Sequence, residues 1–409
     1  MRGGRAGVGR APLPSGFGVI WTTVALDLVG FGIVLPVLPL YAKRFHASAG
    51  TAGALVAAFS LAQLVASPLW GRLSDRVGRK PVLIVSLFGT AVGSLLTGLA
   101  AGLPLLFLAR LIDGGSGASV SVAQASVADL AAPEQRARLF GLLGAAFGLG
   151  FVLGPAIGGA LSPISPRLPF YVAAVIAAAN GLVAIRRLPE TGGRRHLAAT
   201  EHADGPGDER SIRPATGRVA LLAVAFMSMV AFSGFEATFA LFGARRLGLH
   251  QSSTYVVFTV IGVLIALDQV ALVHPIVSRV GERTALQSGL LLNGAGLAIL
   301  PFVHTLWALA PSLVLLTAGQ GLITPTLTAT VAGQVGPDVR GRVLGLQQSA
   351  GGLARVVGPA LAGLAFGHIG PWVPYAGGAV VVGVAAVTLA AVPRSAPAPD
   401  VGPVMTPVG

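Results

Sequence analysis

Six ionisable residues lie inside long apolar stretches of the chain, where charge is rare. They are the acids Asp27, Asp113, Glu236 and Asp268 and the bases Arg110 and Arg355. A charged side chain in hydrocarbon is costly, so such groups usually face a cavity or a partner. The acids outnumber the bases by two, and the excess acids must bind a proton, a cation, or each in turn. These residues predict proton or cation chemistry within a membrane.

The stretches that hold these residues are membrane spans by length and composition. Hydrophobic residues make up 54% and charged residues 11% of 409, which excludes a soluble globular domain. A spanning helix needs about 20 mainly apolar residues. Twelve segments qualify: 16–42, 48–70, 81–101, 104–128, 138–161, 169–188, 219–243, 254–277, 284–303, 306–332, 343–366 and 372–392. We expect an all-α polytopic membrane protein with twelve transmembrane helices.

Lys and Arg are distributed unevenly between the connecting loops. With the N-terminus in the cytoplasm, 21 of them lie on the cytoplasmic side and five on the outer side. Because Lys and Arg are enriched in cytoplasmic loops, both termini are expected in the cytoplasm, and the protein in the cytoplasmic (inner) membrane. The loops also account for the formal charge of +13, so the lipid bilayer, and no nucleic acid, is the expected partner.

Two stretches of the chain repeat at almost the same offset. Residues 136–159 and 340–363 share twelve of 24 positions at an offset of 204. The sequence "GRLSDRVGRKPVL" from Gly71 aligns with "HPIVSRVGERTAL" from His274 at an offset of 203. Two separate stretches therefore indicate one internal repeat.

The repeat predicts two six-helix halves, 1–188 and 218–409. The polar stretch 189–217 between them is expected to be a cytoplasmic linker. Halves related in this way enclose a central site that opens to one side of the membrane at a time. The interface between the halves is therefore where a binding site is expected.

Several motifs resemble those of the major facilitator superfamily. Residues 71–80, "GRLSDRVGRK", are similar to its signature loop, Arg110 to its second motif, and residues 148–159, "GLGFVLGPAIGG", to the glycine-proline motif of its exporters. The stretches "VALDLVGFGIVLPVLP" and "LPET" resemble the twelve-span drug:proton antiporters, among them the tetracycline/proton antiporters. The resemblance implies the major facilitator fold and proton-coupled export.

The resemblance also implies a gate at the cytoplasmic ends of the spans. Its residues are Gly71, Asp75, Arg76, Gly78, Arg79, Lys80 and Asp129. Asp75 would face the N-terminal end of span 11, where the helix dipole is positive, and Arg76 would pair with Asp129. In the second copy Ser278 replaces Asp75, so membrane orientation alone does not require this acid. Together the contacts would latch the two halves on the cytoplasmic side.

A stripe of small residues runs along span 5, where Gly150, Gly154 and Gly158 fall at every fourth position. Such a stripe allows close packing of helices. With Pro155 and Gly159 it makes up the exporter motif, and the resemblance implies that the Gly154-Pro155 pair bends the helix and seals the cavity against leak.

The acids and bases of the N-terminal half have two interpretations each. Asp27, near the middle of span 1, is either a protonated acid bonded to a neighbouring helix or, as the resemblance implies, a coupling or substrate-binding acid. Arg110 and Asp113 are three residues apart on one helical face. They either form a structural pair or join Glu236 in a cluster toward the outer half of the cavity.

The charges of the C-terminal half depart from the tetracycline antiporters. Arg355, which takes the repeat position of Phe151, lies at a similar depth to Asp268. The two either pair structurally or stay apart, in which case Asp268 becomes a second proton or substrate site. Gly93, Asn293 and Ile265 stand where the tetracycline antiporters carry ionisable residues. The family is therefore indicated more strongly than tetracycline itself.

Together these patterns predict proton-coupled efflux of small amphipathic compounds or drugs by alternating access. The six intramembrane charges would line the substrate cavity, and the substrate would be lipophilic and cationic or zwitterionic. We expect a functional monomer driven by the proton gradient, with no cofactor, no metal site and no enzymatic activity. The alternatives are an exporter or importer of a metabolite, such as a sugar or amino acid derivative, and a membrane sensor that does not transport.

Overall fold

The computed structural model describes residues 13–191, 215–333 and 337–392. The first half of this chain forms α1 (Phe17–Val34), α2 (Leu38–Lys43), α3 (Ala49–Val77), α4 (Arg79–Leu99), α5 (Leu103–Ser116), α6 (Ser119–Leu130), α7 (Pro133–Leu161) and α8 (Leu168–Arg187). The second half forms α10 (Ala215–Leu247), α11 (Gln251–Ala271), α12 (Val273–Val280), α13 (Glu282–Ile299), η3 (Leu300–Phe302), α14 (Leu306–Gly333), α15 (Pro337–His368) and α16 (Val373–Ala391). Within the described residues, twelve helical segments are long and apolar enough to cross a membrane, which confirms the predicted number.

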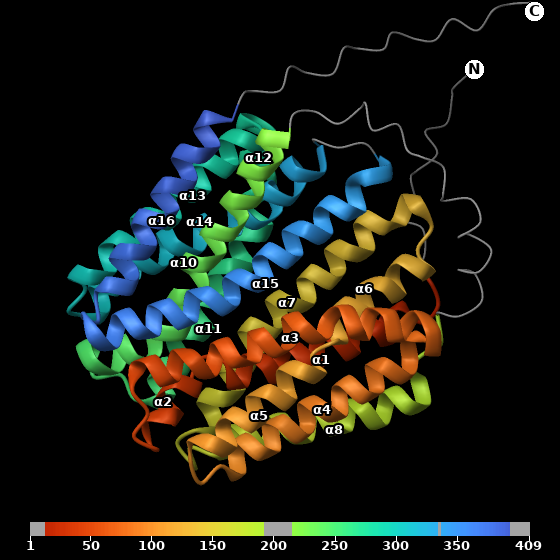
Figure 1. Ribbon diagram of the computed structural model, residues 1–409, viewed down its shortest axis with the longest axis horizontal. Helices are drawn as coiled ribbons and strands as arrows, with labels where there is room; N and C mark the ends of the chain where they lie inside the picture. The colour runs from red at the N-terminus through yellow and green to blue at the C-terminus, as the bar shows by residue number, and fades with distance from the viewer. Residues whose placement is uncertain (1–12, 192–214, 334–336, 393–409) are drawn as a thin grey trace, which may run out of the picture.

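The predicted linker 189–217 lies mostly outside the described residues. Only its two ends are described: the last residues after α8, as far as Thr191, and the start of α10 at Ala215. The division into halves therefore rests on how the helices pack. In Figure 1, α1 to α8 lie together in one body and α10 to α16 in the other.

The fourth span is broken between α5 and α6, and side chains of α3 and α4 bond to the freed backbone groups: Trp70 and Gln63 donate to the carbonyl oxygens of Gly115 and Gly117, and Ser86 bonds on both sides of the break. The Ser86 hydroxyl donates to the carbonyl oxygen of Ser116 at 2.5 Å and accepts from the backbone N–H of Ala118 at 3.1 Å. Unpaired backbone groups are costly at membrane depth, so a neighbouring side chain must replace the lost helical bonds. The break brings Ser119 to the start of α6, where it faces α1.

The two halves meet through α3 with α15 and through α7 with α11. A Cβ on Gly53 would lie 3.0 Å from the Cα of Gly363, so the backbones of α3 and α15 are in direct contact. Gly262 of α11 packs against the backbone of Phe151 in the same way. The Tyr255 hydroxyl donates across the interface to the carbonyl oxygen of Ile33 at 2.8 Å.

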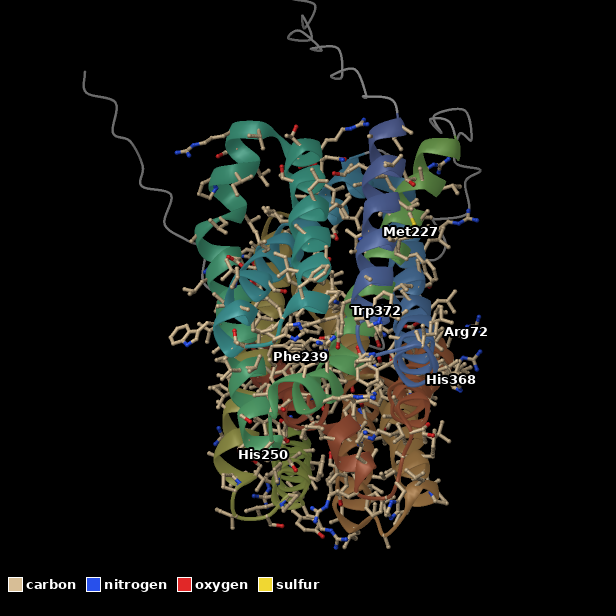
Figure 2. The ribbon with its side chains drawn as sticks, turned by 90° about the vertical axis from the view of Figure 1, so that its left-hand side faces the viewer. Arg72, Met227, Phe239, His250, His368 and Trp372 are labelled. Carbon is tan, nitrogen blue, oxygen red and sulfur yellow. The ribbon has the colours of Figure 1, made fainter. Side chains whose placement is uncertain are left out.

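These contacts lie toward one end of the molecule, which carries α2 and the end of α15. Figure 1 shows the halves diverging toward the opposite end, where α3 turns into α4 and α12 into α13. Figure 2 shows His250 before the start of α11, His368 at the end of α15 and Trp372 before the start of α16. The helices of the two halves therefore lie farther apart at the end that carries the α3–α4 turn.

The small-residue stripe of α7 packs against two different helices. A Cβ on Gly154 would lie 2.6 Å from the backbone of Gly32 in α1, and one on Gly158 would lie 2.5 Å from the ring of Tyr255 in α11. A Cβ on Gly150 would lie 2.7 Å from Leu28. The stripe therefore holds α7 against its own half and against the other half. Sealing of the cavity by Gly154-Pro155 stays a prediction.

Gly154→Ala should destabilise the protein, because the added methyl group forces α1 and α7 apart. Overpacking of this kind costs about 1–3 kcal/mol. Gly148→Ala is the matched control, since a Cβ there meets nothing within 4 Å and alanine favours the helix. Thermal unfolding of the purified protein in detergent measures both. Equal unfolding midpoints for the two variants would contradict the close approach.

Candidate functional site

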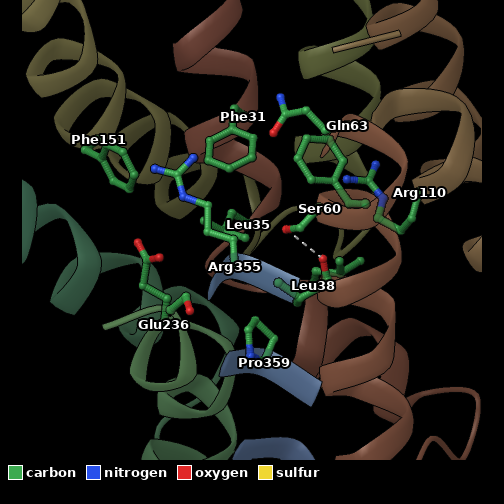
Figure 3. Close-up of a pocket in the computed structure, with 13 residues that line it drawn as sticks. Phe31, Leu35, Leu38, Ser60, Gln63, Arg110, Phe151, Glu236, Arg355 and Pro359 are labelled. Atoms are coloured by element: carbon green, nitrogen blue, oxygen red, sulfur yellow. Dashed lines mark hydrogen bonds between the residues drawn. The ribbon is translucent and has the colours of Figure 1, made fainter. Parts of the chain in front are cut away.

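A cavity with about 630 Å³ of empty space, part of it open to solvent, lies between the two halves (Figure 3). Its lining comes from α1, α2, α3, α5 and α7 on one side and from α10 and α15 on the other. The lining residues are Phe31, Leu35, Leu38, Val56, Phe59, Ser60, Gln63, Arg110, Phe151, Ser233, Glu236, Arg355 and Pro359. Three of the six predicted charges, Arg110, Glu236 and Arg355, therefore meet in one cavity.

Three phenylalanine rings form much of the apolar wall of this cavity. The ring centroids of Phe31 and Phe59 are 5.6 Å apart, and those of Phe31 and Phe151 are 6.4 Å apart with the rings edge to face. The sequence analysis did not single out Phe31 or Phe59. A phenylalanine is ordinary in an apolar span. Of the three, only Phe151 stands out in the sequence, because it aligns with Arg355 in the internal repeat.

Arg110 and Asp113 form a buried ion pair. The Arg110 Nη1 lies 3.0 Å from the Asp113 Oδ2, and the Nη2 donates to the Thr97 hydroxyl at 2.9 Å. The guanidinium carbon also lies 5.9 Å from the ring centroid of Phe59, which is within reach of a cation–π contact. The two side chains are 4% and 8% exposed. The structural pair is therefore formed, and Arg110 shares the cavity with Glu236.

The surroundings of Gly93 explain why span 3 carries no acid at this position. A Cβ at this position would lie 2.6 Å from the Cβ of Asp113 and 3.1 Å from the carbonyl oxygen of Ala109. The side chain of Asp113 thus fills the space that an acid on Gly93 would need.

Asp27 lies beside the cavity rather than in its lining. The Ser119 hydroxyl donates to its Oδ2 at 2.5 Å, while Oδ1 is buried with no hydrogen-bond partner. Asp113 is the charged group that acts on Asp27 through space. The predicted bond to a neighbouring helix is present, and the second oxygen is free to carry a proton. Sequence reasoning missed Ser119, since only the break before α6 turns it toward α1.

Arg355 faces Glu236 and not Asp268, so of the two alternatives the one in which Asp268 and Arg355 stay apart holds. Glu236 is under the electrostatic influence of Arg355, whereas Asp268 lies beside Thr317 and Gly321 of α14. The Oδ2 of Asp268 is buried without a partner. Similar depth did not bring the two together because the cavity lies on one side of α15 and Asp268 points from α11 toward α14.

At the α3–α4 turn, Arg79 makes the contacts predicted for Arg76. Arg79 lies 2.6 Å from Asp75, 3.1 Å from Asp129 and 2.6 Å from the Ser74 hydroxyl. The predicted Arg76–Asp129 pair is therefore wrong. Gly78, with φ +102°, ends α3 and lets Arg79 fold back between the helices, while Arg76 is exposed.

Glu190, which follows the end of α8, caps the start of α4. Its carboxylate accepts the backbone N–H of Arg79 at 2.7 Å and that of Lys80 at 3.2 Å. A Cβ on Gly78 would lie 2.6 Å from this carboxylate, and a Cβ on Gly71 would meet nothing within 4 Å. Glu190 was quoted within "LPET" but not identified as part of the gate.

The predicted contact between Asp75 and the start of span 11 falls partly outside the described residues. Side chains are not described for residues 334–341. Within the described part of the chain, Asp75 pairs with Arg79 of its own half. The latch between the halves stays a prediction.

Arg79→Gln should destabilise the N-terminal half by about 1–2 kcal/mol, since it removes two ion pairs of which one is half exposed and screened. Arg76→Gln is the matched control, and at an exposed position it should change stability by no more than about 0.5 kcal/mol. Thermal unfolding in detergent separates them. A larger loss of stability for Arg76→Gln than for Arg79→Gln would favour an Arg76–Asp129 pair.

Arg110→Met should cost about 3–5 kcal/mol, because it leaves Asp113 buried without a counter-charge. The double variant Arg110→Met/Asp113→Asn should unfold at a higher temperature than Arg110→Met, since no isolated charge remains. The comparison is made by thermal unfolding of the three purified proteins. A double variant no more stable than the single one would mean that the two residues are not energetically coupled.

The architecture is that of an alternating-access carrier: two helical halves with a charged cavity between them. The family model of the Major Facilitator Superfamily matches residues 20–286 and 270–404. The chain belongs to this superfamily. Within the described residues, no group of three or more His, Asp or Glu could hold a metal ion.

Two kinds of curated relative cover most of the chain. It is 33% identical over 347 residues to the class B tetracycline resistance protein of Escherichia coli, covering 84% of this chain and 86% of that protein. It is 30% identical over 362 residues to multidrug resistance protein 2 of Bacillus subtilis (strain 168), covering 86% and 88%.

Solved structures share the fold. The human organic anion transporter MFSD10 (TETRAN) is 26% identical with a TM-score of 0.69, over 91% of this chain and 98% of that one. The nucleoside transporter NupG, at 14% identity and a TM-score of 0.76 over 92% and 100%, supports the fold alone. The family and the structural neighbours are transporters.

Proposed function

We propose that this protein exports drug-like amphipathic compounds in exchange for protons. The observation that carries the proposal is the cavity between the halves, in which Arg110, Glu236 and Arg355 meet an aromatic wall. The names of the relatives, tetracycline and multidrug resistance proteins, support the same substrate class.

The orientation follows from the loops. If the side with 21 Lys and Arg is cytoplasmic, both termini lie in the cytoplasm and the diverging end of the halves faces inward. The conformation is then inward-open, ready to take substrate from the cytoplasm or the inner leaflet. A multi-pass protein of this family belongs in the cytoplasmic membrane.

The proton gradient would supply the energy, with no cofactor. Asp27 has one oxygen held by Ser119 and one buried oxygen free, so protonation of this acid can alternate with substrate occupancy of the cavity. The two halves of one chain line the cavity, and we propose that the protein acts as a monomer.

Asp27→Asn should abolish substrate uptake driven by a pH gradient, because the amide cannot release a proton. The coupling is measured in everted membrane vesicles with an acidic interior. Substrate uptake into the vesicles and proton release from them are recorded together. Glu282→Gln, at an exposed acid of α13, is the control and should transport normally. Coupled transport that persists in Asp27→Asn would exclude this acid as the proton carrier, and absence of gradient-driven transport of any drug would refute the export.

A further inference from the structure

Arg355 and Glu236 are opposite charges of the cavity that form no close ion pair with each other. Within the described part of the chain, Arg355 has no hydrogen bond and no carboxylate oxygen within 4.0 Å, although it is the charge that faces Glu236. The Arg355 side chain is exposed to the cavity, and Glu236 is partly buried. Arg110, by contrast, is paired with Asp113.

Each of the two groups has a definite chemical preference. A guanidinium presents five N–H donors in a planar fork that matches the two oxygens of a carboxylate. A carboxylate accepts hydrogen bonds from a positively charged nitrogen, and both contacts strengthen away from bulk water. Figure 3 shows the Arg355 guanidinium projecting toward Phe31 and Phe151, with the Glu236 carboxyl on the same side of the cavity.

The gap between Arg355 and Glu236 is therefore open to a molecule that carries both charges. An amphipathic cation without an anionic group would leave Arg355 uncompensated. A simple anion would leave Glu236 uncompensated. The rings of Phe31, Phe59 and Phe151 provide a surface for an aromatic body.

We propose that the cavity selects aromatic zwitterions, whose anionic group binds Arg355 and whose cationic nitrogen binds Glu236. This rests on the proposed function and narrows its substrate class, since permanently cationic compounds without an anionic group are disfavoured. The sequence analysis had allowed cationic and zwitterionic substrates alike.

The two-point contact also connects substrate to proton. A protonated Glu236 has no negative charge for the cationic nitrogen, so proton and substrate compete for this carboxylate. The other charged groups that face it in the cavity are Arg355 of α15 and Arg110 of α5. Binding of a zwitterion from the inside thus excludes a proton from Glu236, which is the order that antiport requires.

The internal repeat supplies a natural test variant. Arg355 stands where the first half carries Phe151, and both residues line the cavity. Arg355→Phe replaces the guanidinium with the side chain of the other half. Arg355→Lys keeps the charge and removes the planar fork.

Rhodamine 110 and rhodamine 123 are matched probes, because the second is the methyl ester of the first. Both carry the cationic ring system, and only rhodamine 110 has a free carboxylate. Binding to the purified full-length protein is measured by fluorescence polarisation. We expect rhodamine 110 to bind about tenfold or more tightly, as for one charge-assisted contact.

The variants should change the preference in different ways. Arg355→Phe should abolish the preference for rhodamine 110, and Arg355→Lys should reduce it. Glu236→Gln should weaken the binding of both dyes. Arg72→Phe, at an exposed arginine outside the cavity, should bind as the unchanged protein does. Size-exclusion profiles check that each variant is folded, and Arg355→Lys serves if Arg355→Phe is not.

The proposed recognition of zwitterions and the proposed proton-coupled export can be refuted separately. The recognition is overturned if neither dye binds, if rhodamine 123 binds as tightly as rhodamine 110, or if the preference survives both Arg355 variants. Gradient-driven export of both dyes at equal rates leaves export standing and overturns the recognition. A clear binding preference without gradient-driven export supports the recognition and refutes the export.

Discussion

Charge inside hydrocarbon has to be paired, hydrogen-bonded or exposed to a wet cavity, and the arrangement of the spans follows from that cost. Arg110 is paired with Asp113 and bonded to Thr97, so the pair ties α5 to α4. Asp27 is held on one side only, by Ser119. Arg355 is exposed to the space between the halves. Arg110 and Arg355 both line the cavity, but within the described residues only Arg110 has an ion-pair partner.

The same cost applies to the backbone, and it explains two irregular places in the N-terminal half. Where the fourth span breaks, Ser86 replaces the missing helical bonds. At the α3–α4 turn, Glu190 accepts the free N–H groups at the start of α4. In both cases a side chain far away in the sequence supports the irregular segment, and a neighbouring side chain, Ser119 or Arg79, gains its position from it.

The spans could be predicted from the sequence because length and apolar composition alone define them. The Arg110–Asp113 pair followed from a spacing of three residues within one helix. The contacts of Arg76 and Asp268 could not be predicted, because they depend on how each helix is rotated about its axis and where a helix ends. The depth of a residue in the membrane follows from its position along a span. The side of the helix on which its side chain lies depends on contacts with distant parts of the chain.

The halves touch through glycine backbones, as at Gly53 with Gly363 and at Gly262 with Phe151. Interlocked side chains resist sliding, because each must leave its groove before the helices move. A smooth backbone surface has little to disengage. Tilting one half against the other therefore requires little repacking at these glycine contacts, whereas the Tyr255 ring and its hydrogen bond to Ile33 must be released.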